Sequence, residues 1–293
     1  MYSGRINYMK IAILGTGLMG SAMGEAIINA GHQLIVYNRT PERTKPLVEK
    51  GAKAVFTAAQ AISEADATII VLLDGVAVKN LLLNEETLAV VNNKKIISAA
   101  SSTVDEIIEI AVVVAQHGGQ FAEMSMQAYA NALRTATGTF VVGCNAEDEK
   151  FWVETLSSFS GGAQRVGEIG DATKIESVAL VGSMISMINV GYSTAVAQKL
   201  GLAPEVYEPI INMMVPSAAY VLPKMITHDY NEIVGSIESY VSGLTTLIDI
   251  VKSKGMPTEV LEEMKKLFEK ATTGGYAQKD RAAVLEVILN PRN

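Results

Sequence analysis

The stretch Gly15-Thr16-Gly17-Leu18-Met19-Gly20 directly follows the apolar run Ile11–Leu14 and opens an amphipathic segment that extends to Asn29. In this context each glycine has a separate role. The first makes a tight turn, the second lets the backbone approach a pyrophosphate, and the third lets helix and strand pack closely. The start of the helix would face the phosphates. The stretch therefore predicts a dinucleotide-binding βαβ unit, in which all six residues are candidate cofactor contacts.

The residues after the second predicted strand indicate which dinucleotide is bound. An NAD site places a carboxylate roughly 20 residues after the glycines, where it binds the ribose 2′-hydroxyl. This chain has Asn38-Arg39-Thr40 there instead. Arg39 can form paired hydrogen bonds with a 2′-phosphate, and Asn38 and Thr40 can donate further ones. The arrangement predicts a preference for NADP(H), and the alternative is that Arg39 is a solvated loop residue.

Two more loops follow predicted strands. Leu72, Leu73 and Asp74 end or follow one apolar run, and Ser101-Ser102-Thr103 follows the next. Ligands of open α/β sheets lie at the carboxyl ends of the strands. We therefore expect the backbone of Leu72, Leu73, Asp74 and Ser101 to contact the ribose and the nicotinamide. For Ser101 and Thr103 the alternative is an N-cap on a predicted helix over 103–117.

Short apolar runs alternate with amphipathic segments from Lys10 to about Val166. This alternation predicts a mostly parallel, doubly wound sheet covered by helices on both faces. After Gly170 no strand-like run recurs, and one long helix is predicted over Ala172–Leu200. The predicted fold class is an α/β Rossmann domain over residues 9–167, an interdomain helix over 168–200 and an all-α domain over 201–293. The predicted strands are Lys10–Leu14, Gln33–Tyr37, Ala67–Leu72, Lys95–Ser98, Gln120–Ala122, Thr139–Gly143 and Ala163–Val166.

Composition restricts the partners and the compartment. The chain has 293 residues, with 31 acidic and 24 basic side chains, a net charge of -7 and a pI of about 5.2. This balance argues against nucleic acid or an anionic membrane as a partner, because both require a surplus of Lys and Arg. Cys144 has no second cysteine to pair with, and the three histidines are far apart. We expect a cytoplasmic protein with a small-molecule substrate and no metal site.

The segment Ser177–Gln198 contains no charged residue. Its length is close to the roughly 20 residues of a membrane-spanning helix. Polar residues interrupt it, and Glu176 and Lys199 flank it, which favours a helix buried in protein over a membrane span. Such a helix presents more apolar surface than one small helical domain can cover, so we expect a homodimer.

These features together resemble the β-hydroxyacid dehydrogenase superfamily, which includes the 3-hydroxyisobutyrate and 6-phosphogluconate dehydrogenases, and within it the NADPH-dependent imine reductases. The resemblance covers nearly the whole chain from Met9. It implies a domain-swapped dimer, in which the active cleft lies between the cofactor domain of one chain and the helical domain of the other. It rests on the glycine stretch, on Asn38-Arg39-Thr40-Pro41, on Leu72-Leu73-Asp74 followed by Ala77-Val78, and on Gly275–Glu286.

Two departures separate the chain from the hydroxyacid dehydrogenases. These enzymes bind the substrate carboxylate with an Asp-Ala-Pro-Val-Ser-Gly-Gly segment, where this chain has Glu123-Met124-Ser125-Met126-Gln127-Ala128-Tyr129. They also carry an Asn one helical turn after the catalytic lysine, where this chain has Val178. Both departures weaken the case for a hydroxyacid substrate.

The resemblance places the proton donor near the start of the long helix. Lys174 follows Gly170 at the spacing of the dehydrogenases' catalytic lysine, and Ser177 stands where imine reductases have an Asp or Tyr. Lys174 and Ser177 share a helix face, whereas Glu176 points elsewhere. The alternative for Lys174 is a solvated surface residue.

Three functions stay open at this point. The first is NADPH-dependent imine reduction. The second is a hydroxyacid or aldehyde dehydrogenase-reductase with Lys174 as general acid and base. The third is a non-catalytic NADP-binding protein, which Ser177 and Val178 favour.

Overall fold

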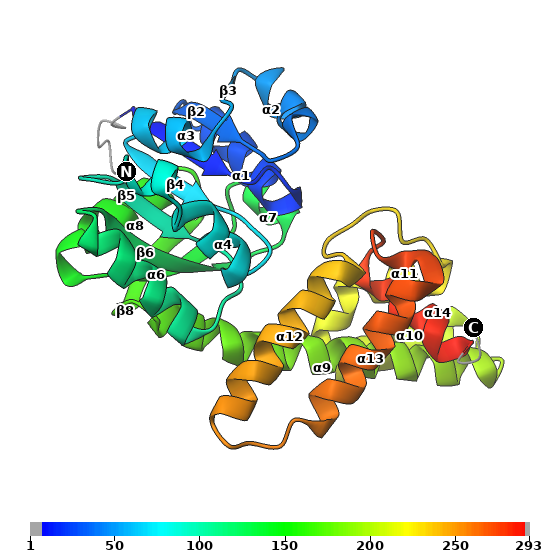
Figure 1. The fold of residues 1–293 in the computed structure, drawn as a ribbon. Helices are drawn as coiled ribbons and strands as arrows, with labels where there is room; N and C mark the ends of the chain where they lie inside the picture. The colour runs from blue at the N-terminus through cyan, green and yellow to red at the C-terminus, as the bar shows by residue number, and fades with distance from the viewer. Residues whose placement is uncertain (1–7, 291–293) are drawn as a thin grey trace. The chain divides into compact units, whose positions relative to one another are not determined.

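The computed structural model describes residues 8–290, apart from the side chains of residues 216 and 217. The chain divides into two compact units, and the boundary falls between Glu176 and Ser177. The first unit contains the sheet, and the second consists of helices (Figure 1). The predicted fold class, a Rossmann domain followed by an all-α part, is therefore confirmed. The domain limits at residues 167 and 200 remain predictions.

The described part of the first unit forms an eight-stranded sheet in the order β3-β2-β1-β4-β5-β6-β7-β8. All neighbours are parallel except β6 and β7. The strand order reverses between β1 and β4, which is where open sheets of this type bind dinucleotides. The strands are β1 Lys10–Leu14, β2 Gln33–Tyr37, β3 Lys53–Ala54, β4 Ala67–Ile70, β5 Lys95–Ser98, β6 Gln120–Gln127, β7 Thr139–Gly143 and β8 Gly162–Gly167.

The observed strands differ from the predicted ones at a few places. The strand β4 ends at Ile70, two residues before the predicted end. The strand β6 extends to Gln127 because it pairs with the antiparallel β7 beyond its parallel pairing with β5. The two-residue strand β3 was not predicted, since two residues are too few to show a period-2 pattern.

Helices cover both faces of the sheet (Figure 1). Ile11 and Ile13 enter one hydrophobic core, and Ala12 and Leu14 enter the other, because successive side chains of a strand point to opposite faces. These helices are α1 Leu18–Asn29, η1 Pro41–Thr44, α2 Lys45–Val48, α3 Ala58–Glu64, α4 Gly75–Leu82, α5 Glu85–Leu88, α6 Val104–Gln116, α7 Ala130–Arg134, η2 Ala146–Asp148 and α8 Glu149–Ser157.

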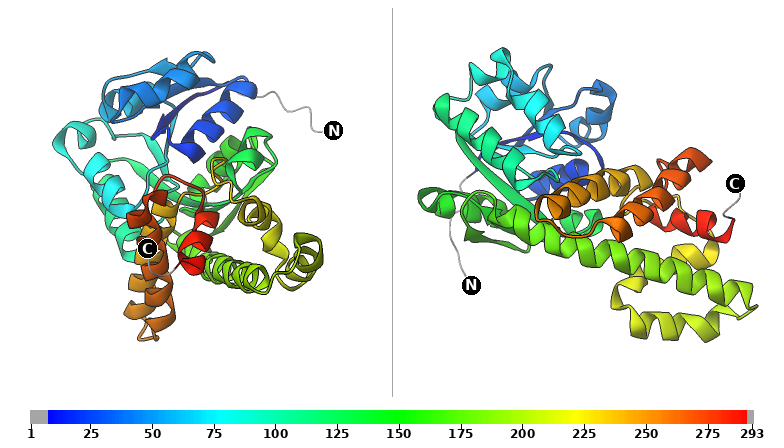
Figure 2. Two further views of the ribbon diagram at one scale, coloured as in Figure 1. Left: turned by 90° about the vertical axis from the view of Figure 1, so that its right-hand side faces the viewer. Right: turned by 60° about the horizontal axis from the view of Figure 1, so that its bottom comes forward.

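The long helix α9, Asp171–Lys199, begins in the first unit and continues through the second, close to the predicted bounds. Within the second unit it runs beside the shorter helices (Figure 2). No strand follows it up to residue 290. The other elements are α10 Pro204–Met214, η3 Pro216–Tyr220, α11 Leu222–Thr227, α12 Ile237–Ser253, α13 Glu259–Ala271, η4 Thr272–Tyr276, η5 Arg281–Ala283 and α14 Val284–Leu289.

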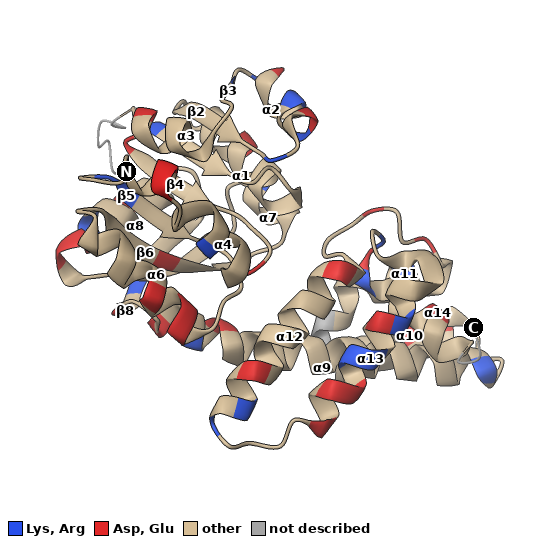
Figure 3. Cartoon of the chain, in the orientation of Figure 1, with Lys and Arg blue, Asp and Glu red and all other residues tan. Residues whose placement is uncertain are grey.

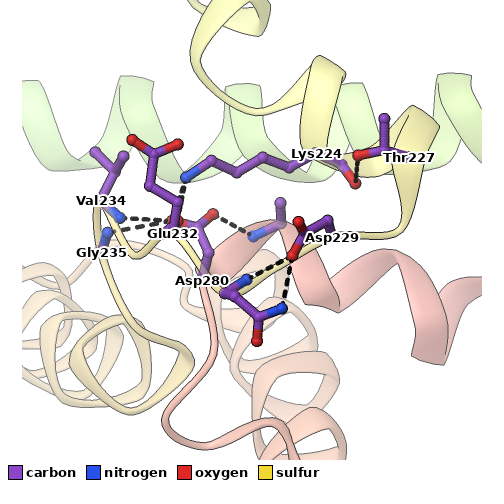
Figure 4. Close-up of polar contacts among 9 residues, drawn as sticks. Lys224, Thr227, Asp229, Glu232, Val234, Gly235 and Asp280 are labelled. Carbon is purple, nitrogen blue, oxygen red and sulfur yellow. Dashed lines mark hydrogen bonds and ion pairs between the residues drawn. The ribbon is translucent and has the colours of Figure 1, made fainter.

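A buried ion pair organises the second unit (Figure 4). The fully buried Asp280 accepts hydrogen bonds from Lys224 Nζ at 3.2 Å, from the Val234 N–H at 2.8 Å and from the Ala282 N–H at 3.0 Å. Lys224 also donates to the carbonyl of Glu232. A buried charge is tolerated when it is paired and hydrogen-bonded. These contacts fix the loop between α11 and α12 against the chain that precedes η5.

Helix α9 is apolar over most of its length. By length and composition this helix could cross a membrane, and the core helices of soluble proteins can have the same length and composition. Beyond Glu176 it lacks charges until its last residue (Figure 3). The exposed large apolar side chains of α9 and α10 are Ile175, Val178, Ile185, Tyr192, Val196, Val206, Ile210, Met213 and Met214.

Candidate cofactor-binding site

Two of the three glycines of the stretch are required by the packing of the turn itself. Gly15 has a φ of +105°, which side chains rarely adopt, and a Cβ on it would lie 2.2 Å from the carbonyl oxygen of Val71. A Cβ on Gly20 would lie 1.9 Å from the carbonyl oxygen of Gly15. These residues hold β1, α1 and the end of β4 close together, as the sequence predicts for the turn and packing glycines.

Gly17 lies in a different environment. It is the N-cap of α1, no side chain caps this helix, and the first turn contains no acidic residue. A Cβ on Gly17 would meet no atom within 4 Å. The fold therefore does not require a glycine here, whereas an incoming pyrophosphate would need both the space and the N–H groups of the first turn. The residues of this turn fit a dinucleotide.

Polar contacts tie the predicted 2′-phosphate loop to the glycine stretch. The Asn38 amide donates to Thr16 Oγ1 at 3.0 Å and accepts from the Thr40 N–H at 2.9 Å. Thr16 Oγ1 donates to the carbonyl of Arg43 at 3.0 Å. The side chain of Asn38 thus shapes the loop. Arg39 is exposed on the same loop, and its guanidinium forms no ion pair with any described residue.

The loops after β4 and β5 come together at the carboxyl edge of the sheet. Asp74 and Ser101 form an isolated parallel bridge. Asp74 caps α4 by accepting from the Ala77 N–H at 2.8 Å, and Leu73 is 47% exposed. Thr103 is the N-cap of α6, which is the alternative role that the sequence left open for it. The hydroxyl of Ser101 instead donates to Glu176 Oε1 at 2.9 Å.

Glu176, near the start of α9, lies at this edge of the sheet, where it contacts Ser101. Glu176 is half-buried, and burial raises the pKa of its carboxyl to about 7, while the hydrogen bond from Ser101 opposes the rise and the nearby Glu123 adds to it. From the sequence Glu176 has no assigned role, because helical spacing places it on another face than Lys174 and Ser177. The signal in the sequence that could have pointed to Glu176 is its position directly before the uncharged segment Ser177–Gln198.

The two predicted proton donors lie elsewhere on the same helix. Lys174 Nζ lies 2.7 Å from Asp171 Oδ1, and its side chain is 63% exposed. Ser177 is half-buried and is the first residue of the second unit. The contact between Ser101 and Glu176 involves neither of them.

Glu123 fixes the first turn of α9 and was also missed. This buried carboxylate on β6 accepts from the backbone N–H groups of Gly170 at 2.7 Å and Ala172 at 3.0 Å, and from the hydroxyl of Thr173. Burial raises the pKa of Glu123, and these hydrogen bonds oppose the rise. The residue acts as a remote cap for the helix, where negative charge is favourable. An acidic residue inside an apolar strand was the signal in the sequence.

Residues 10–169 match the family model of the NAD binding domain of 6-phosphogluconate dehydrogenase. Among curated proteins, an NADPH-dependent reductive aminase of Aspergillus oryzae is 22% identical over 97% of this chain and 98% of its own length. An uncharacterized oxidoreductase, YfjR of Bacillus subtilis, is 28% identical over 72% of this chain and 75% of its own.

Solved structures show the same fold. A Mycobacterium tuberculosis 3-hydroxyisobutyrate dehydrogenase superposes with a TM-score of 0.80 at 19% identity and covers 96% of this chain and 99% of its own. An imine reductase from Myxococcus stipitatus in complex with NADP+ has a TM-score of 0.67 at 20% identity, and the match covers 95% of this chain and 99% of that one.

Within residues 8–290, no group of three or more His, Cys, Asp or Glu side chains could hold a metal ion.

Proposed function

Because the chain belongs to the family of the NAD binding domain of 6-phosphogluconate dehydrogenase and is an NADP-dependent oxidoreductase, we propose that it reduces the C=N bond of a small-molecule imine. The observation that carries the choice of substrate is the similarity to a reductive aminase over 97% of this chain. When bound, NADPH supplies the hydride. The residues of the chain bind and orient both reactants and supply the proton.

The cofactor-binding roles follow the carboxyl edge of the sheet. The N–H groups at the start of α1, beside Gly17, bind the pyrophosphate. The guanidinium of Arg39 binds the 2′-phosphate, on a loop that the side chain of Asn38 holds in shape. The loops that contain Asp74 and Ser101 lie over β4 and β5, and they bind the nicotinamide half.

The end of β6 supports a substrate without a carboxylate. Here the strand continues through Gln127, paired with β7, where the resemblance implies a carboxylate-binding segment in hydroxyacid dehydrogenases. Ser125 is buried, and its hydroxyl accepts a hydrogen bond from the Gln127 side chain at 2.9 Å. Ser125 only accepts in this contact and keeps its own O–H donor, so the argument against a substrate carboxylate rests on the missing family segment.

The product nitrogen needs a proton, and we assign the role of proton donor to Lys174 or Ser177. Lys174 carries an ammonium group on the first turns of α9. Ser177 follows on the same helix face and would act through water, because a serine hydroxyl alone is a weak acid.

Two further expectations belong to this proposal. The exposed apolar faces of α9 and α10 are the surfaces through which two chains would form the domain-swapped homodimer. The lone buried Cys144 is compatible with a reducing, cytoplasmic location.

Steady-state oxidation of NADPH tests the function. We expect turnover with small cyclic imines such as 1-pyrrolines, and with aldehydes only when an amine is also present. Turnover of aldehydes or keto acids without an amine, or NADP+ reduction by 3-hydroxyacids, would identify a dehydrogenase-reductase instead. Tight NADPH binding without turnover of any compound would identify a non-catalytic NADP-binding protein.

A further inference from the structure

The hydrogen bond from Ser101 to Glu176 joins two segments that lie 75 positions apart in the sequence. Ser101 follows β5 and is bridged to Asp74, which follows β4. In a sheet with this strand order, the first strands bind the adenosine half of a dinucleotide, and β4 and β5 lie under the nicotinamide half. The 2.9 Å contact therefore places the carboxyl group of Glu176 at the nicotinamide end of the proposed cofactor site.

The other charged groups near this edge have partners of their own. Glu123, on β6, accepts from two backbone N–H groups and from Thr173. Asp171 and Lys174, on the same helix as Glu176, pair with each other. Two further carboxylates cap helices: Asp74 caps α4, and Glu106 forms the capping box of α6.

Glu176 differs from these groups. Among the described residues its carboxyl accepts one hydrogen bond, from the hydroxyl of Ser101, it caps no helix, and no cation lies within ion-pair distance of it. Because burial raises the pKa of Glu176 to about 7, a small change in pH near neutrality changes its charge.

We propose that the carboxylate of Glu176 favours the oxidised cofactor over the reduced one, and so helps the cofactor to give up its hydride. The inference rests on the proposed cofactor site. The nicotinamide ring is neutral in NADPH and carries one positive charge in NADP+. A negative charge in a half-buried position attracts that positive charge more strongly than it would in water. Loss of the hydride creates the same positive charge, so ionised Glu176 stabilises the ring as the reaction proceeds.

The test is the ratio of two dissociation constants, Kd for NADP+ divided by Kd for NADPH, measured by calorimetry between pH 6 and pH 8. The 2′-phosphate also titrates in this range, but it is common to both ligands and cancels in the ratio. Above pH 7 the carboxylate is ionised and NADP+ binds better. We therefore expect the ratio to fall by about threefold or more between pH 6 and pH 8.

Two variants separate the role of Glu176 from other titrations. Glu176→Gln keeps an acceptor for Ser101 but has no charge, so its ratio should not depend on pH. Ser101→Ala removes the hydrogen bond that lowers the pKa of Glu176, so its ratio should still change with pH, with the midpoint moved upward. Glu154→Gln, the same chemical change at an exposed position on α8, is the matched control and should behave as the unmodified protein.

The outcomes distinguish this inference from the proposed function. A ratio that does not depend on pH in the unmodified protein, while both dinucleotides bind, overturns the role of Glu176 and leaves the cofactor site in place. A dependence that persists in Glu176→Gln also overturns it, and so does an unmoved midpoint in Ser101→Ala. If neither dinucleotide binds, the cofactor site itself is wrong, and this inference fails with it.

Discussion

The ammonium group of Lys174 lies 2.7 Å from the carboxylate of Asp171, one turn earlier on α9. Because the lysine side chain is 63% exposed, this pair contributes little to stability, on the order of 0–1 kcal/mol. Replacement of Lys174 therefore leaves the fold intact. A loss of activity in such a variant would report on chemistry.

We predict that Lys174→Met lowers kcat for the best imine substrate by about 10²-fold or more, the usual effect of losing a positioned proton donor. Steady-state NADPH oxidation measures it, with circular dichroism to check the fold. A loss of less than about threefold, well under 1 kcal/mol of barrier, would exclude Lys174 as the donor. Ser177→Ala then becomes the decisive variant.

A pair of glycine variants should separate folding from cofactor binding. The Cβ of Gly17→Ala would enter open space, so this variant should melt near the temperature of the parent but bind NADPH at least about tenfold more weakly. The Cβ of Gly20→Ala would lie 1.9 Å from a carbonyl oxygen, so this variant should lose stability. Thermal melting and NADPH titration measure both effects. Unchanged NADPH affinity in Gly17→Ala would contradict the assigned pyrophosphate site.

Arg39 should determine the choice between the two dinucleotides. Charge-assisted hydrogen bonds to the 2′-phosphate are worth about 1.5–3 kcal/mol, so the unmodified protein should bind NADPH roughly tenfold or more tightly than NADH. Arg39→Ala should narrow this gap. The control Arg134→Ala, which removes another exposed arginine of the first unit, should not. Equal affinities for NADH and NADPH in the parent would refute the assignment.

The buried His32 should make stability fall in mild acid. Its Nδ1 accepts the Met9 N–H at 3.3 Å, and its Nε2 lies 2.8 Å from Ser158 Oγ, so the folded state needs a neutral ring. Burial lowers the pKa of His32 below 6.5, so the unfolded chain binds the proton more tightly. This contribution is complete above about pH 6.5 and is lost as the pH falls through the folded pKa.

Urea unfolding at pH 7.5 and pH 5.5 measures this contribution. The difference in free energy of unfolding between the two pH values should shrink in His32→Gln. It should stay the same in His117→Gln, which replaces an exposed histidine. An unchanged difference in His32→Gln would assign the acid sensitivity to other groups.

The chain should form a dimer through α9 and α10. Light scattering at micromolar concentration should give a mass of about 62 kDa, twice the 31.2 kDa of one chain. Val196→Lys, at a 55% exposed position on α9, should shift the mass toward that of the monomer. Val112→Lys is the control, because Val112 is similarly exposed on α6 of the first unit. A mass near 31 kDa for the parent protein would disprove the dimer.

Local sequence patterns predicted most strands and the long helix, while the residues assigned to the cofactor remain predictions. The bounds of β1, β2, β5, β7 and α1 agree with the prediction because periodicity, flanking glycines and a buried position all act over a few residues. The spacing of the three glycines and the absence of a carboxylate at Asn38-Arg39-Thr40 can likewise be recognised from residues that are neighbours in the sequence. The roles of Lys174 and Ser177 came from a resemblance and remain predictions.

Only the tertiary structure brings together the groups that lie far apart in the chain. Strand β6 lies beside β5, and the start of α9 lies close to both strands. Glu123 on β6 therefore contacts the first turn of α9, and Glu176 on α9 contacts Ser101, which follows β5. Neither contact follows from spacing, because it depends on the strand order and on how the helix packs. The half-burial that changes the pKa of Glu176 has the same origin: desolvation is set by all the atoms around a group, and most of them belong to distant segments.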